Sequence, residues 1–358
     1  MTDRLHVALT GDFVKPNGDF AFPGFDLDPL RQHTKIDLHY LQDCSEITAQ
    51  QIRDVDALLF SGGAITTESF HANGRLALIA RFGVGYDTID VNACTANNVA
   101  LVITPSGVRR PVAVAILTHI LVLTQKFMEK ERLCRQGPKG WAQVTDFNGT
   151  GLVGKVLGSV GFGNIAREMF RITAPLQMRP IAYDPYVDAS IARELGVEMA
   201  DLDTVLRQSD ILTINCPLNS STRHLLDRNR LSLMKPTALL INTARGAIVD
   251  QAALAELLQS KRIAGAGLDV FEQEPLSEND PLLACENAVL TPHALCWTDQ
   301  LYSGCANANI QAVLDVFAGK IPKDIVNKGI TQQPEWLAKL SRFASGTGFE
   351  RRPRAQQT

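Results

Sequence analysis

Short apolar runs alternate with amphipathic segments along most of the chain. In the first third, such runs predict five strands, at residues 7–10, 36–39, 57–60, 78–80 and 100–103. The stretch 48–55 has helical spacing and predicts a helix between two of them. Strands that alternate with helices are typical of an α/β layer with a parallel sheet.

The pattern changes at Pro111. Proline suits the first helical turn, where its missing N–H is not needed, so Pro111 is expected to open a long apolar helix over about 112–127. The apolar run 112–123 is interrupted by Thr118 and His119 and is shorter than a bilayer span. It therefore predicts a buried helix and no membrane association.

A polar, glycine-rich stretch then leads to a stricter alternation. Six apolar strands are predicted at residues 156–160, 181–183, 211–214, 238–241, 265–268 and 288–290, with helical segments between them. This pattern is typical of a doubly wound parallel sheet. A further helix is expected over 298–318, and residues 321–327 are expected to return to the first domain.

The first of these six strands runs into a dinucleotide-binding fingerprint. Residues 158–166 read Gly-Ser-Val-Gly-Phe-Gly-Asn-Ile-Ala and contain G-x-G-x-x-A. Gly161 would permit the tight turn, Gly163 would let the backbone approach a pyrophosphate, and a helix from about Asn164 would point its N–H groups at that anion. Glycines alone also fit a simple turn. However, Asp184 follows the second strand, 21 residues after Gly163. Its carboxylate would bind the adenosine ribose and repel a 2′-phosphate, which favours NAD over NADP.

The later strands of this sheet are also followed by polar residues. These are Asn215, Cys216, Pro217 and Thr222 after the third strand, Thr243 and Arg245 after the fourth, Asp269 and Glu274 after the fifth, and His293 after the sixth. Ligands of open α/β sheets bind at the carboxyl ends of the strands, so these side chains are candidates for one site.

The residue types suit a 2-keto or 2-hydroxy acid. The guanidinium of Arg245 matches a carboxylate and a carbonyl oxygen. His293 can exchange the proton that accompanies hydride transfer, and a glutamate such as Glu274 can fix its tautomer and favour the imidazolium. Each residue alone has a plainer interpretation: a surface ion pair, a structural hydrogen bond, a turn cap at Asp269 or a solvated carboxylate. Their shared position at one edge of the sheet favours the functional interpretation.

Composition narrows the class of protein. The chain has 358 residues, 45% hydrophobic and 20% charged, enough for two cores. The net charge of −3 argues against nucleic acid as a partner. Seven cysteines without a C-x-x-C indicate neither a disulfide framework nor a metal site, and with no signal peptide at the N-terminus they favour the cytoplasm. The basic cluster Arg351, Arg352 and Arg354 is expected in a solvated tail.

Several ordered segments resemble the D-isomer-specific 2-hydroxyacid dehydrogenase family, which includes phosphoglycerate, glyoxylate and formate dehydrogenases. The similarity spans roughly residues 55–328. It rests on residues 81–90, 158–166, 183–185, 209–218, 241–250, 267–275 and 291–293.

The resemblance implies a fold of two Rossmann-like or flavodoxin-like doubly wound α/β domains with an active-site cleft between them. The flavodoxin-like substrate domain would comprise residues 1–107 and 300–358, and the NAD-binding Rossmann domain residues 108–299. Members are usually homodimers that pair through the middle domain.

The resemblance also implies roles. Arg245 would orient the substrate, His293 would be the acid/base and Glu274 its partner. The cofactor residues would be Gly161, Phe162, Gly163, Asn164, Ile165, Asp184, Cys216, Pro217, Thr222, Thr243 and Asp269, with Asp269 beside the nicotinamide carboxamide. The substrate residues would be Arg81, Val84, Gly85 and Arg109, with the backbone N–H groups of Val84 and Gly85 on the carboxylate.

The chain departs from the family pattern in places. Val114 stands where a glutamate is usual, which changes the expected interface geometry. Residues 294–297 and Arg81 resemble the branch that contains the C-terminal binding proteins, and Glu274 replaces the glutamine of formate dehydrogenases, which disfavours formate. Arg109 and Arg110 could meet a second anionic group on the substrate, or could be surface charges flanking Pro111.

Two functions therefore stay open. The first is an NAD-dependent oxidoreductase that interconverts a D-2-hydroxy acid and its 2-keto acid. The second is an NAD(H)-sensing regulator that acts through protein partners. The set Arg245, Glu274 and His293 favours the enzyme, although the regulatory branch retains the same set.

Overall fold

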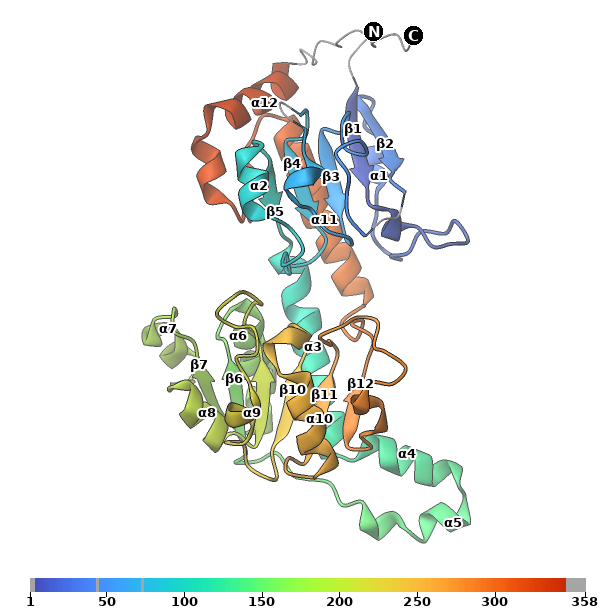
Figure 1. Cartoon of the computed structure of the whole chain (residues 1–358), viewed down its shortest axis with the longest axis vertical. Coiled ribbons are helices and arrows are strands. Elements are labelled where there is room, and N and C mark those ends of the chain that lie inside the picture. Colours follow the sequence, from blue (N-terminus) through green and yellow to red (C-terminus); the bar gives the residue numbers. More distant parts are fainter. Residues whose placement is uncertain (1–3, 43–44, 72–73, 346–358) are drawn as a thin grey trace. The chain divides into compact units, whose positions relative to one another are not determined.

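The computed structural model describes residues 4–42, 45–71 and 74–345. They form two compact units, each with one parallel sheet (Figure 1). The first unit holds the described residues up to Val108 and from Thr298 onward, and the second holds Arg109–Trp297. These boundaries lie within two residues of the expected ones. Cys44 and the basic cluster of the tail lie outside the described residues. The cleft expected between the domains stays a prediction.

The sheet of the first unit has five strands in the order β2-β1-β3-β4-β5, all parallel. They are β1 (Leu5–Leu9), β2 (Ile36–Tyr40), β3 (Ala57–Phe60), β4 (Leu78–Arg81) and β5 (Ala100–Val102). The five strands predicted from the apolar runs are confirmed. The central strand β3 is buried at all four positions, as expected for a parallel strand covered on both faces.

The helix predicted at 48–55 is wrong, because the segment forms turns. The side chains of Thr48 and Gln51 bond reciprocally to each other's backbone N–H, at 3.3 and 2.9 Å. Local bonds of this kind compete with helical ones. The apolar positions that suggested helical spacing, Ile52 and Val55, are buried in the core beside the sheet.

Three helices with five or more residues belong to this unit alone: α2 (Val91–Ala96), α11 (Asp299–Phe317) and α12 (Pro334–Ser345), beside the short α1 (Asp28–Arg31). The helix predicted at 298–318 is confirmed as α11. The unpredicted α12 is held by Trp336, whose indole donates to the carbonyl of Ala77 at 3.0 Å, and by buried Lys339, whose ammonium donates to the carbonyls of Leu76, Asn97 and Asn98.

The predicted return of residues 321–327 to this unit is confirmed. Ile325 forms an antiparallel bridge with Val102 of β5. The side chain of Asn327 accepts from the N–H of Leu101 and donates to the carbonyl of Val99, both at 2.9 Å.

The second unit has a seven-stranded parallel sheet in the order β12-β11-β10-β9-β6-β7-β8. The strands are β6 (Val156–Val160), β7 (Arg179–Tyr183), β8 (Glu198–Met199), β9 (Ile211–Ile214), β10 (Leu239–Asn242), β11 (Gly265–Leu268) and β12 (Ala288–Leu290). The six predicted strands are confirmed, and β8 is additional. With two residues and no apolar run, β8 carried no signal. The chain order reverses at β6, which pairs with both β7 and β9.

Helices cover both faces of this sheet. They are α6 (Asn164–Thr173), α7 (Ala189–Glu194), α8 (Leu202–Gln208), α9 (Arg228–Leu231) and α10 (Gln251–Gln259). One core cluster joins α8, α9 and α10 to alternate strand residues such as Leu240 and Leu268. The residues between them face the opposite side, where a Cβ at Gly267 would touch His119 of α3 (Pro105–Thr124).

The predicted helix start at Pro111 is wrong, because α3 begins at Pro105 and contains Pro111. The first turn is fixed by tertiary packing instead: a Cβ at Gly107 would lie 2.5 Å from the backbone nitrogen of Cys305 in α11. The helix ends at Thr124, and Lys126 takes a left-handed conformation (φ 54°) before α4 (Phe127–Arg135) and α5 (Pro138–Trp141).

With 20 residues, α3 is long and apolar enough to cross a membrane, contrary to the expectation from residues 112–123. However, 61% of its apolar window is buried inside the protein, which is typical of a core helix. The short 3-10 helices are Gly11–Phe13, Thr67–Ser69, Val144–Asp146, Ala174–Leu176, Gly246–Ile248, Pro281–Ala284 and Lys328–Gln332.

Candidate active site

The glycine-rich loop joins β6 to α6 at the carboxyl edge of the seven-stranded sheet (Figure 1). Gly161 has a φ of 95°, and a Cβ there would lie 2.7 Å from the backbone of Asn215 and Cys216. Gly161 is therefore required for the loop to pass the end of β9. At Gly163 a Cβ would meet no described atom within 4 Å. Gly163 is the N-cap of α6 and offers no side-chain cap, so the N–H groups of the first turn face an accessible space.

Asp184 connects this loop to the end of β7. Its two carboxylate oxygens accept hydrogen bonds from the N–H groups of Phe162 and Tyr186, at 2.8 and 2.9 Å. A carboxylate has about four acceptor positions, so each oxygen can accept a further bond. The predicted ribose acceptor thus stands beside the predicted pyrophosphate loop.

The predicted cofactor residues after β9 form a tight turn. The hydroxyl of Thr222 donates to the carbonyl of Pro217 at 2.7 Å and accepts from the N–H of Asn219 at 2.8 Å. Burial raises the pKa of the Cys216 thiol to about 12, with a smaller contribution in the same direction from Asp184 and an opposing backbone hydrogen bond. Cys216 is therefore a neutral thiol that shapes the wall of the site.

One predicted cofactor residue has an unused polar group. The hydroxyl oxygen of Thr243, directly after β10, is buried and finds no hydrogen-bond partner among the described residues. An orphaned buried hydroxyl costs free energy unless a ligand completes its bonding. Together with the open space at Gly163 and the remaining acceptor capacity of Asp184, it fits a bound dinucleotide.

His293 and Glu274 form a close pair. Nδ1 of His293 lies 2.7 Å from Oε2 of Glu274, and Oε1 of Glu274 accepts from the N–H of Phe271 at 2.9 Å. Burial acts to raise the pKa of Glu274, but the hydrogen bond and charge of His293, the N–H of Phe271 and the charge of Arg245 together lower it below its ordinary value. Glu274 is therefore ionised at neutral pH and fixes one nitrogen of the imidazole.

Arg245 is brought to the same edge by close backbone packing. A Cβ at the following residue, Gly246, would fall 1.9 Å from the carbonyl carbon of Phe271. Glycine thus lets the chain after β10 pack directly on the loop that carries Glu274. The side chain of Arg245 donates to the carbonyl of Ala244 at 2.7 Å, and its charge acts on Glu274 as described above.

Asp269 is buried next to the segment that follows His293. It accepts from the hydroxyl of Thr291 at 2.7 Å and from the N–H groups of Ala294 and Leu295 at 3.1 and 3.2 Å. Burial raises the pKa of Asp269, against these hydrogen bonds and the charge of His293. The carboxylate therefore fixes the segment that directly follows His293, a residue in a left-handed conformation (φ 53°).

The predicted substrate residues of the first unit form one loop after β4. Arg81 donates through Nε to the carbonyl of Gly85 at 2.8 Å and through a guanidinium nitrogen to the carbonyls of Ser61 and Phe82. Val84 and Gly85 are partly exposed. The structure thus shows Arg81 shaping the loop, and its contact with substrate stays a prediction.

Arg109 and Arg110 lie beside a buried carboxylate. Both approach Glu168 of α6, at 3.8 and 3.0 Å, and Arg171 pairs with the same carboxylate. The side chain of Glu168 is only 5% exposed, so it requires positive neighbours. This arrangement gives both arginines a structural role that the sequence did not suggest, and a contact with a second substrate anion stays a hypothesis.

Comparisons with known proteins agree with this geometry. Residues 117–294 match a family model described as D-isomer specific 2-hydroxyacid dehydrogenase, NAD binding domain. The chain is 33% identical over 315 residues to a glyoxylate reductase of Korarchaeum cryptofilum, covering 87% of this chain and 95% of the relative. The chain belongs to the D-isomer-specific 2-hydroxyacid dehydrogenase family.

Two further members of the 2-hydroxyacid dehydrogenase family illustrate the extent of the similarity. A glyoxylate reductase of Aeropyrum pernix is 37% identical over 263 residues, covering 72% of this chain and 78% of the relative. The crystal structure of a glyoxylate reductase from Paecilomyes thermophila superposes with a TM-score of 0.77 at 26% identity, covering 91% of this chain and 99% of the other. The two α/β domains expected for this family are confirmed.

Sequence reasoning missed some residues of the site. The sequence patterns assign no functional role to His119 and include Thr291 only as part of a family motif, yet both lie against Asp269 or its partner. The available signal was Gly267, because a glycine inside a strand marks a close approach by another group.

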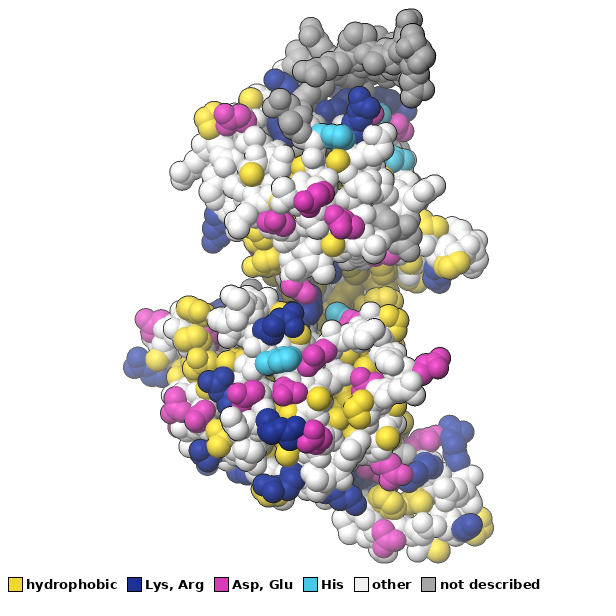
Figure 2. Space-filling view, viewed as in Figure 1, with side chains coloured by type: hydrophobic (Ala, Val, Ile, Leu, Met, Phe, Trp, Pro, Cys, Tyr) yellow, Lys and Arg dark blue, Asp and Glu magenta, His cyan; other side chains and the backbone are white. Residues whose placement is uncertain are grey.

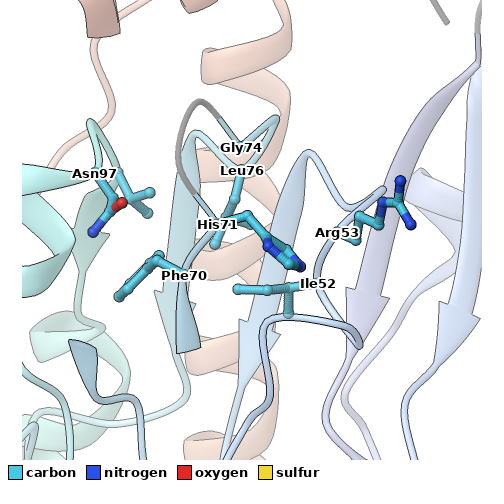
Figure 3. A pocket seen from close by; sticks show the side chains of 8 residues that line it. Ile52, Arg53, Phe70, His71, Gly74, Leu76 and Asn97 are labelled. Carbon is cyan, nitrogen blue, oxygen red and sulfur yellow. The ribbon is translucent and has the colours of Figure 1, made fainter. Parts of the chain in front are cut away.

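A small pocket in the first unit is unrelated to these residues (Figure 3). Ile52, Arg53, Phe70, His71, Gly74, Leu76, Asn97 and Val99 line it. None of them belongs to the predicted site, so we assign the pocket no catalytic role. Among the described residues, no group of His, Cys, Asp or Glu has an arrangement that could hold a metal ion.

We expect Asp184→Ser to weaken the discrimination between the two nicotinamide cofactors. Loss of the carboxylate removes both an acceptor for the ribose hydroxyls and the charge that repels a 2′-phosphate. The ratio of kcat/KM with NADH to that with NADPH should fall by about tenfold or more. Asp188→Ser is the matched control, because Asp188 is a nearby exposed carboxylate that caps α7. An unchanged ratio in Asp184→Ser would refute the assignment of Asp184.

Proposed function

We propose that this NAD-dependent 2-hydroxyacid dehydrogenase reduces a small 2-keto acid to the D-2-hydroxy acid, and catalyses the reverse oxidation. The observation that carries the proposal is the 2.7 Å pair of His293 and Glu274 at the same sheet edge as the dinucleotide loop. The glyoxylate reductases among its relatives support a substrate as small as glyoxylate.

When bound, NADH supplies the hydride for the keto carbon. The chain's own residues manage charge and protons. The guanidinium of Arg245 offers a planar fork for the substrate carboxylate and keto oxygen, and its charge stabilises the negative charge that develops on that oxygen. His293 donates a proton from Nε2 to the same oxygen, since Nδ1 is held by Glu274.

Glu274 and Asp269 prepare His293 for this step. The ionised Glu274 holds Nδ1 of His293 at 2.7 Å and leaves Nε2 to donate the proton in reduction. Asp269 fixes the backbone that follows His293 and, as the resemblance implies, would also lie beside the nicotinamide carboxamide. The second candidate, an NAD(H)-sensing regulator, has no specific observation in its favour.

The reaction class is tested with a panel of 2-keto acids and NADH, followed at 340 nm. Glyoxylate, pyruvate, hydroxypyruvate, phenylpyruvate, oxaloacetate and 2-oxoglutarate cover small, apolar and dianionic side chains. We expect turnover of at least one acid, and a loss of about a hundredfold or more in kcat for His293→Ala, because general acid catalysis contributes on this scale.

His224→Ala is the matched control for that experiment. His224 forms the other histidine–glutamate pair of this unit, 3.1 Å from Glu272, and is similarly exposed. The control should retain activity within about twofold. NADH binding without turnover of any acid, or equal effects of the two substitutions, would contradict the proposal.

Glu274→Gln should change the pH profile. The lowered pKa of Glu274 keeps it ionised as the pH falls to its ordinary value of 4.5, so the pair with His293 persists through the acidic range and is lost only below it. The amide of the Glu274→Gln variant carries no charge, so the variant lacks the ionised partner of His293. We expect kcat/KM for reduction to fall by about tenfold or more at pH 7, and the difference from the wild type to narrow only below pH 4.5, where Glu274 of the wild type also loses its charge. Glu272→Gln, in the same loop, should leave the profile unchanged.

A homodimer that pairs through the second unit is also proposed. Large apolar side chains are exposed along residues 114–153 of this unit: Val114, Leu121, Phe127, Met128, Trp141, Val144 and Val153. Figure 2 shows several hydrophobic side chains among charged ones on the arm formed by α4 and α5. Exposed large apolar side chains that recur along one segment are typical of a protein interface.

Light scattering during gel filtration tests the dimer. We expect a mass of twice 39.1 kDa for the wild type and a monomer for Trp141→Glu, because Trp141 is 68% exposed on this arm. Tyr186→Glu is the control, since Tyr186 is 88% exposed elsewhere on the same unit. A monomeric wild type would refute the proposal. We further propose a cytoplasmic location, supported by the free thiols of Cys94, Cys134, Cys216, Cys285 and Cys305.

A further inference from the structure

His119 lies inside the second unit, with its imidazole against the face of strand β11. The residue is 1% exposed. A Cβ on Gly267 would approach Cγ and Nδ1 of His119 to 2.7 and 2.8 Å, so the strand has no side chain where the ring rests. Asp269 follows Gly267 by two residues in the chain. The absence of a side chain at Gly267 therefore allows His119 to reach the level of the active-site edge.

The far nitrogen of His119 meets Thr291. Nε2 lies 3.5 Å from the hydroxyl oxygen of Thr291, a long contact, and that hydroxyl lies 2.7 Å from Oδ1 of Asp269. A threonine hydroxyl has one proton and two acceptor positions. The carboxylate can only accept, so the proton of Thr291 goes to Asp269. The hydroxyl can then only accept from His119, and it does so in the tautomer that carries the proton of the neutral ring on Nε2.

This protonation state agrees with the surroundings. Burial lowers the pKa of His119 to about 4, so the ring is neutral at physiological pH. A neutral ring carries one N–H, and the Nε2 tautomer presents it to Thr291. His119 and Thr291 then both donate in the same direction, from the helix α3 toward the carboxylate of Asp269.

The network ends on the backbone beside the acid/base. Asp269 accepts from the N–H groups of Ala294 and Leu295, the two peptide groups that follow His293. The carbonyl of Thr291 accepts from the N–H of His293 itself at 3.0 Å. The backbone carbonyl of Thr291 therefore holds His293 directly. Through Asp269, the hydroxyl of Thr291 also contributes to the position of Ala294 and Leu295.

We propose that His119 is a positioning residue for the acid/base His293: its Nε2–H orients the hydroxyl of Thr291, which in turn orients Asp269 and the segment 293–295. The inference rests on the proposed function for its catalytic readout, although not for its structural one. This positioning role of His119 differs from a packing role because it depends on a single N–H group and not on the volume of the ring.

A double-substitution cycle on kcat separates the two roles. His119→Leu keeps an apolar side chain in the core but removes the donor, and we expect kcat to fall about fivefold with KM for the keto acid changed less than twofold. Thr291→Val removes the hydroxyl that links His119 to Asp269 and should lower kcat by about tenfold or more. The double variant should be no slower than Thr291→Val, because both substitutions interrupt the same network. Additive losses would overturn the proposal.

Conservative rescue and a packing control complete the kinetic test. His119→Gln carries an N–H near the position of Nε2 and should recover most of the lost kcat. Ile120→Val, at the next and equally buried position of α3, should lower the denaturation midpoint without changing kcat. If His119→Gln is as slow as His119→Leu, or if Ile120→Val lowers kcat equally, His119 is a packing residue only.

Hydrogen exchange of the backbone amides gives a readout that needs no turnover. The amides of Ala294 and Leu295 should exchange at least threefold faster in His119→Leu and in Thr291→Val than in the wild type or Ile120→Val, because their acceptor is less fixed. Wild-type protein that reduces no keto acid but shows this pattern would refute the proposed function and leave the network supported. Turnover with unchanged exchange would refute the network alone.

Discussion

The parallel register of the seven-stranded sheet is the constraint on which the site depends. Every strand of the second unit runs in the same direction, so every loop after a strand emerges at one edge. The pairing of β6 with both β7 and β9 sets the point at which the loops diverge. Residues more than a hundred positions apart, such as Gly163 and His293, are thereby placed along one edge without any need for local sequence proximity.

Close backbone approaches then set the geometry within that edge. Gly161, Gly246 and Gly267 each occupy a position where a Cβ would lie less than 3 Å from another group. Each absence of a side chain has a different consequence: the first allows the dinucleotide loop to pass β9, the second brings Arg245 onto the loop of Glu274, and the third admits the ring of His119. These three close approaches are possible only because the glycines have no side chains.

The predictable part of the fold follows from burial. Strands covered on both faces must be apolar throughout. The apolar runs 57–60 and 211–214 therefore predict the strands β3 and β9 with their observed ends. The failures have local causes. Thr48 and Gln51 replace helical bonds by side-chain bonds, β8 is too short to show a pattern, and Pro111 is tolerated inside α3 because the turn before it is fixed by packing at Gly107.

The site was predictable as a set of positions but not as a set of contacts. Strand ends and motifs placed Glu274 and His293 in the same region, and the structure adds the 2.7 Å contact between them. The partners of Arg81 and Arg109, in contrast, are carbonyl oxygens and the buried Glu168, which no spacing rule could identify. Side chains that bond to backbone or to a distant helix leave no periodic signal in the sequence.

The transfer of an isotopic label tests the central claim most directly. NADH deuterated at both C4 hydrogens would be incubated with the best 2-keto acid whose product is chiral at C2, and the product would be analysed by NMR and chiral chromatography. We predict one deuterium at C2 of a product that is the D-2-hydroxy acid. A product without deuterium at C2, or of the L configuration, would contradict it.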